Sequence, residues 1–181
     1  MNRKLLSALF LAATAMTAPV AFAADGMITI NGSVTGQTCT INGNGTGASS
    51  FLVTLPTVST SALKSAGQRA GATPIRIELT ECTPGASNVH VLFEPGFSTD
   101  MGTGNLKLDA GGATNVQIGL ANQDPAFTII HLGVADAEQN SKSVSIVDGS
   151  AELKYIAEYV ATGPAGPGPA RSRVLYTLVY Q

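Results

Sequence analysis

The final stretch of the chain reads Ser172-Arg173-Val174-Leu175-Tyr176-Thr177-Leu178-Val179-Tyr180-Gln181. Its even positions from Val174 to Tyr180 are apolar or aromatic, and some odd positions are apolar as well. Alternation with period two predicts a β-strand, and a strand so rich in apolar residues is typical of one with neighbours on both edges. The sequence stops at Gln181. We therefore expect one edge neighbour of this strand to come from elsewhere in the chain or from another molecule.

A second amphipathic strand pattern lies near the other end of the sequence, within residues 24–36. One face of this strand carries Ile28, Ile30, Gly32 and Val34. The alternate positions between them are polar, as period two requires. Glycine on an apolar face adds no packing, so Gly32 predicts a close approach of another backbone.

The first residues have the pattern of a secretory signal peptide. Arg3 and Lys4 precede an apolar run that begins at Leu5, and Ala21-Phe22-Ala23 has the small residues that signal peptidase requires. We predict a signal peptide over residues 1–23. The apolar run is too short to favour a transmembrane helix, which needs roughly 20 apolar residues.

The length and net charge of the chain indicate the number of domains and the kinds of partner to expect. Residues 24–181 suit a single domain with a buried core. Loss of Arg3 and Lys4 reduces ten basic residues to eight against twelve acidic ones, a net charge of −4. A mildly acidic surface argues against nucleic acid and against anionic membrane as partners.

Cys39 and Cys82 are the two cysteines of the chain. In an exported protein an isolated pair predicts a disulfide, and two unpaired thiols are the alternative.

Short alternating runs separated by turn residues occupy the rest of the chain. Residues 74–79, 88–91 and 143–146 each place apolar side chains two apart, while 42–47 and 163–169 are rich in the Gly, Asn and Pro of loops. We expect eight or nine strands. Together with one disulfide they favour an immunoglobulin-like sandwich or a related barrel.

In combination these features resemble the chaperone–usher pilin family, the subunits of type 1 and P fimbriae. The family's N-terminal donor strand corresponds to residues 24–36. Its first cysteine context corresponds to Cys39-Thr40-Ile41, and a strand precedes the second cysteine, Cys82. Each motif is weak alone, but their order and spacing together are specific.

Further matches lie toward the C-terminus. Residues 155–163 look like the family's strand before the last loop. The family has a glycine fourteen positions from the end and a penultimate tyrosine, and these correspond to Gly168 and Tyr180. One position departs from the pattern: Gly26 stands where the family often has a larger apolar residue. Strand exchange should therefore begin slowly, which the exchange rate of Gly26→Val would test.

The resemblance implies an all-β fold, an incomplete immunoglobulin-like β-sandwich that lacks its last strand and is completed by donor-strand complementation. It implies a signal peptide at 1–23, a donor-strand extension at 24–36 and a pilin domain at 37–181. The expected donor residues are Ile28, Ile30, Gly32 and Val34. The expected acceptor groove and C-terminal strand carry Gly168, Val174, Tyr176, Leu178 and Tyr180.

The family also implies partners and a location. Neighbouring pilin subunits in a homopolymer, a periplasmic pilus chaperone and an outer-membrane usher are expected, with export through the periplasm to a fimbrium at the cell surface. The implied function is a structural subunit of a pilus for adhesion and biofilm formation. The alternative is a minor tip adaptor or adhesin of the same kind of pilus.

The sequence lacks the common signatures of catalytic and metal sites. His90 and His131 lack companions at metal-ligand spacing, and there is no Gly-x-Ser-x-Gly nucleophile motif. A secreted β-sandwich enzyme such as a copper–zinc dismutase would need more histidines. We expect no catalytic residue, no metal and no cofactor.

Overall fold

A computed structural model describes residues 27–34, 36 and 38–181. The chain divides into two units, Met1–Val34 and Thr35–Gln181. The predicted signal peptide and Gly26 lie outside the described residues. In the first unit, residues 27–34 form neither helix nor strand.

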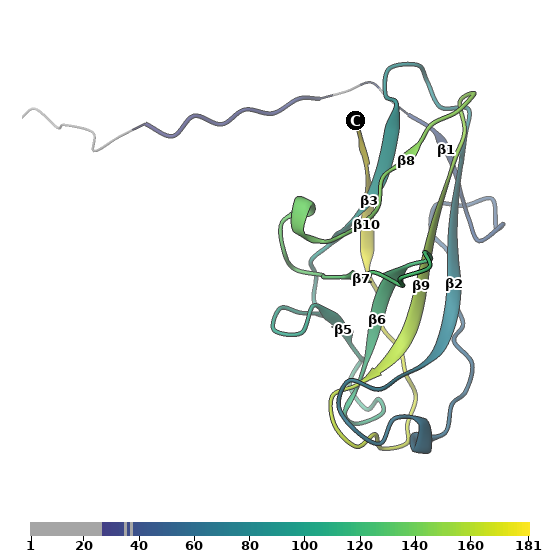
Figure 1. Ribbon diagram of the computed structural model, residues 1–181, viewed down its shortest axis with the longest axis vertical. Helices are drawn as coiled ribbons and strands as arrows, with labels where there is room; N and C mark the ends of the chain where they lie inside the picture. The colour runs from purple at the N-terminus through teal and green to yellow at the C-terminus, as the bar shows by residue number, and fades with distance from the viewer. Residues whose placement is uncertain (1–26, 35, 37) are drawn as a thin grey trace, which may run out of the picture. The chain divides into compact units, whose positions relative to one another are not determined.

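The regular secondary structure of the second unit consists of β-strands and two short 3-10 helices (Figure 1). Its strands are β1 (Thr40–Gly43), β2 (Arg69–Thr80), β3 (Asn88–Glu94), β4 (Thr99–Asp100), β5 (Asn105–Lys107), β6 (Val116–Asn122), β7 (Ile129–Ile130), β8 (Val144–Ser145), β9 (Ala151–Ala161) and β10 (Leu175–Tyr180). Two single-turn 3-10 helices, η1 (Thr60–Ala62) and η2 (Asp136–Glu138), lie in the connections. The described strands exceed the expected eight or nine because β4, β7 and β8 have two residues each.

The strands form two antiparallel sheets. The large sheet has the order β1-β2-β9-β6-β5-β4, with β7 also paired to β6. The small sheet has the order β10-β3-β8. In Figure 1 the long strands β2 and β9 run side by side, and β10 lies beside β3.

A core of alternating apolar side chains fills the space between the sheets. The large sheet contributes Ile77 from β2, Leu120 from β6 and Leu153 from β9, and the small sheet contributes Val89 and Val91 from β3. All five side chains are buried. Period two places every second residue of these strands in the core, as in other sandwiches.

The predicted disulfide joins Cys39 to Cys82 across a sequence separation of 43 residues. Cys39 directly precedes β1, and Cys82 follows β2, to which β1 is paired from Thr40 opposite Thr80. The bond therefore closes the end of the β1–β2 ladder.

Asp124, in the loop between β6 and β7, should make the folded state less stable at low pH. Its carboxylate pairs with Lys142 and accepts hydrogen bonds from the Thr128 N–H and hydroxyl, at 3.0 and 2.9 Å. The bond from Lys142, followed by those from Thr128, lowers the pKa of Asp124 to about 2. A carboxyl whose pKa is depressed by folding stabilises the protein above its ordinary pKa, and this contribution is lost as pH falls from about 4 to about 2.

We therefore expect Asp124→Asn to reduce the loss of stability over that pH range, measured as the urea midpoint at several pH values. Lys142→Met, which removes the main cause of the shift, should reduce it as well. A wild-type slope retained in both variants would contradict this assignment.

Candidate functional site: an apolar groove beside the last strand

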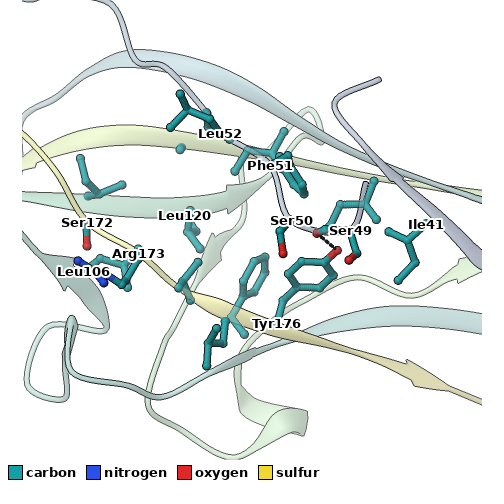
Figure 2. A pocket seen from close by; sticks show the side chains of 18 of the residues that line it. Ile41, Ser49, Ser50, Phe51, Leu52, Leu106, Leu120, Ser172, Arg173 and Tyr176 are labelled. Carbon is teal, nitrogen blue, oxygen red and sulfur yellow. Dashed lines mark hydrogen bonds between the residues drawn. The ribbon is translucent and has the colours of Figure 1, made fainter. Parts of the chain in front are cut away.

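A groove of about 860 Å³ lies between β10 and residues 49–55 (Figure 2). Its lining is mainly apolar. Side chains of the large sheet contribute, among them Ile77, Ile118 and Leu120. The groove therefore reaches the core, which a complete sandwich would cover with a further strand.

Four of the residues expected at the acceptor site line this groove: Val174, Tyr176, Leu178 and Tyr180. Val174 directly precedes β10, and the other three belong to it. All four are half-buried and pack against the core, whereas Leu175, which also lines the groove, is 74% exposed and does not pack against the core. Period two thus separates the core-packed side chains of this strand from the exposed ones.

The backbone of β10 is unpaired on its groove side. Asn88 and Gln181 exchange both of their backbone hydrogen bonds, at 2.9 and 3.0 Å. Because hydrogen-bonded and non-hydrogen-bonded pairs alternate in an antiparallel ladder, the odd residues of β10 bond to β3. The N–H and C=O groups of Tyr176, Leu178 and Tyr180 consequently point away from β3, and no described residue pairs with them.

Residues 49–55 form the opposite wall without joining either sheet. Phe51, Val53 and Leu55 are half-buried against the core, while Leu52 between them is 82% exposed. In the sequence the signal for the second wall is a short apolar run, Phe51-Leu52-Val53 with Leu55, whose alternation appears only in the burial. It belongs to an extended segment that has no strand partner in the described chain.

Tyr176 connects the two walls. Its hydroxyl donates to the Ser49 carbonyl oxygen at 2.7 Å, drawn as a dashed line in Figure 2. Its ring meets that of Phe51 edge-on, with 6.4 Å between centroids. Burial raises the pKa of Tyr176, so the hydroxyl keeps its proton and remains a donor at neutral pH.

Gly168 does not line the groove, although it was expected with the acceptor residues. It lies in the connection before β10, where a Cβ would stand 2.8 Å from the Ala113 backbone nitrogen. The glycine therefore permits two backbone segments to approach closely.

The predicted donor residues are exposed in the first unit. Ile28 and Ile30 are 89% exposed and Val34 is fully exposed. A Cβ on Gly32 would meet nothing within 4 Å, so the close approach expected there is not made within the described residues. Three large apolar side chains at alternating positions are unusual on the surface of a soluble protein.

Polar clusters in the described chain have structural partners. His90 Nε2 lies 2.9 Å from Asp136 Oδ1, which ties β3 to η2. No group of three His, Cys, Asp or Glu side chains is placed to hold a metal ion within residues 38–181 or the other described positions. In the same residues there is no helix with the length and apolarity to span a bilayer.

Comparisons with known proteins give one consistent family. The family model described as FimA, Type-1 fimbrial protein, A, matches residues 55–181. Major fimbrial subunit SMF-1 of Stenotrophomonas maltophilia (strain K279a) is 47% identical over 162 residues, covering 87% of this chain and 94% of that protein. F17 fimbrial protein of Escherichia coli is 46% identical over 176 residues, covering 94% of each.

Solved structures show the same fold at lower sequence identity. The P pilus rod subunit PapA has a TM-score of 0.57 at 20% identity, with coverage of 79% of this chain and 99% of PapA. A subunit from the structure of a chaperone–usher pilus has a TM-score of 0.60 at 22% identity, with coverage of 91% and 100%. The incomplete immunoglobulin-like sandwich expected from the sequence is thereby confirmed.

Proposed function

Since this chain belongs to the type-1 fimbrial protein family, we propose that it is a non-enzymatic shaft subunit that polymerises by placing its residues 24–36 in the groove of a neighbouring copy. It is a fimbrial subunit of the chaperone–usher type.

One observation carries the proposal: an unpaired strand edge and an apolar groove coincide at β10. A strand added beside β10 would pair with the backbone groups of Tyr176, Leu178 and Tyr180 and would cover the exposed core. Strand addition of this kind obtains affinity from backbone bonds and register from alternate side chains. An open edge of this length otherwise invites aggregation.

Residues 24–36 supply matching chemistry. Ile28, Ile30 and Val34 share one face of an extended segment, and each would contribute roughly 1.5–3 kcal/mol on burial before ordering costs. Gly32 on the same face would let the backbones approach where a side chain would not fit. Each copy carries both a donor segment and a groove, which supports a homopolymer.

The expected partners follow from this chemistry. A periplasmic pilus chaperone would cover the groove until assembly, and an outer-membrane usher would exchange it for the next subunit. The polymer would be a fimbrium at the cell surface that serves adhesion and biofilm formation.

The test uses a chain that begins at Gln37, refolded with the disulfide intact, and a synthetic peptide of residues 24–37. We expect excess peptide to raise the melting temperature substantially. A peptide with Ile30→Asp should not, because it would bury a carboxylate in the groove. A peptide with Thr29→Asp, changed on the polar face, should act like the wild type.

No rise in melting temperature, together with a stable monomeric full-length chain, would refute the proposal.

A minor tip adaptor of the same kind of pilus is the alternative, since adaptors also have a donor segment and a groove. The shaft role is favoured because the 47% identical relative is named a major fimbrial subunit. Quantifying the chain in fibres sheared from cells would separate the two: a shaft subunit dominates the preparation, whereas an adaptor is a trace component.

A further inference from the structure

The small sheet has a second edge, on the side of β3 that faces away from β10. Because hydrogen-bonded pairs alternate along the β3–β10 ladder, the backbone N–H and C=O groups of Asn88, His90 and Leu92 point toward β10. The backbone groups of Val89, Val91 and Phe93 therefore point away from β10. β8 pairs with β3 only at Asn88 and Val89. Beyond that point the edge would be open to another strand.

Two side chains occupy the rest of this edge. The Val91 N–H donates to the Tyr155 hydroxyl oxygen at 3.4 Å. The Phe93 N–H donates to Gln139 Oε1 at 3.1 Å, and Gln139 Nε2 donates to the Phe93 carbonyl oxygen at 2.9 Å. The side-chain amide of Gln139 thus makes the two hydrogen bonds with the Phe93 backbone that one residue of a paired strand would make.

Gln139 is held firmly in this position. Its side chain is fully buried. The backbone carbonyl oxygen of Gln139 accepts a hydrogen bond from the His131 N–H at 3.0 Å. In the adjoining η2, the Asp136 carboxylate contacts His90 of β3. The loop that carries Gln139 is therefore attached to β3 at two points.

We propose that Gln139 is a specificity-determining residue that closes the β3 edge beyond β8, so that an extended segment can pair with β10 but not with β3. A primary amide suits this role because it carries a donor and an acceptor on one short group, as a peptide unit does. Unprotected N–H and C=O groups at a sheet edge are a template for strand pairing. The proposal rests on the proposed function only in naming residues 24–36 as the segment that is kept away.

Leucine at position 139 would have a side chain of similar size but could not form hydrogen bonds with the Phe93 N–H and carbonyl oxygen. Asn122→Leu is the matched control. Asn122 is also buried, and its amide bonds to the Thr128 and Asn140 carbonyl oxygens at 3.1 and 2.8 Å and to the Lys142 N–H at 3.1 Å. It anchors the loop that carries Gln139, at Asn140 and Lys142, without touching the β3 edge, so it controls for a general loosening of that loop.

The experiment measures how much fluorescent peptide of residues 24–37 binds the full chain, with hydrogen exchange to locate it. We expect Gln139→Leu to bind about one more peptide per chain than the wild type, with peptide-dependent protection at Phe93, whose N–H loses its partner in this variant. Asn122→Leu should stay at the wild-type stoichiometry. An equal gain in both variants, or no gain in Gln139→Leu, would overturn the proposal.

Gln139→Glu covers the case in which the leucine variant does not fold. A protonated carboxyl has the donor and acceptor of the amide, whereas the ionised form has no donor. Because burial raises the pKa of a carboxyl above its ordinary value of about 4.3, this variant should bind the additional peptide at pH 9 and release it at pH 5. Binding that does not depend on pH would contradict the role of Gln139. Failure of the wild type to bind peptide or polymerise would refute the proposed function, but the gain at β3 would still be measurable.

Discussion

Ile30→Asp in the full-length chain is expected to abolish polymerisation. The substitution removes roughly 1.5–3 kcal/mol of apolar burial and places a carboxylate in the groove, where desolvation costs several kcal/mol more. Together these effects weaken each subunit contact by more than about a thousand-fold. Electron microscopy and size-exclusion chromatography of assembled material would show the loss of fibres.

The control for this prediction is Thr29→Asp, which adds the same charge one residue away. Thr29 lies on the polar face of the segment and would point to solvent from an inserted strand. We expect normal fibres from this variant. Fibres from Ile30→Asp, or their loss in both variants, would mean that the face with Ile28 and Ile30 does not enter the groove.

Removal of the disulfide should have the second large effect. Cys39 lines the groove, and its bond to Cys82 fixes the segment that leads through β1 to the wall at residues 49–55. Closing a loop of 43 residues is worth about 4 kcal/mol in the chain-entropy model. The double variant Cys39→Ser/Cys82→Ser should therefore lower the urea midpoint by roughly 1.5 to 4 M.

Reduced wild-type protein serves as the control, because it lacks the bond but keeps both side chains. Its midpoint should fall to that of the double variant. If reduction left the midpoint unchanged, the β1–β2 ladder alone would be sufficient to hold the groove wall.

Part of the sequence interpretation rests on the regular pattern of the last strand. Alternation over β10 was regular and long enough to place Tyr176, Leu178 and Tyr180 on one face, and the structure directs that face into the groove. The incomplete sandwich followed from this strand, the cysteine pair and the resemblance to pilins, and it is confirmed by the fold of the solved relatives. The roles of Ile28, Ile30, Gly32 and Val34 stay predictions.

Other features could not be predicted because they depend on tertiary contacts. Gln139 looks like an ordinary loop residue in the sequence, and only the fold brings its amide to Phe93, 46 positions away. β4, β7 and β8 are too short to show a period. Gly168 was grouped with the groove on its distance from the chain end, whereas its contact with Ala113 is set by the packing of two loops.

The difference between the β10 and β3 edges of the small sheet would limit how many neighbours the proposed subunit can bind. With β10 open and β3 closed, each copy would accept one strand and donate one, so growth would be linear and unbranched with two chemically different ends. A head-to-tail contact of this kind produces an open filament, unless the rotation between successive subunits closes the chain into a ring. A copy without a usable N-terminal strand would act as a chain terminator, and the proportion of such copies would govern fibre length.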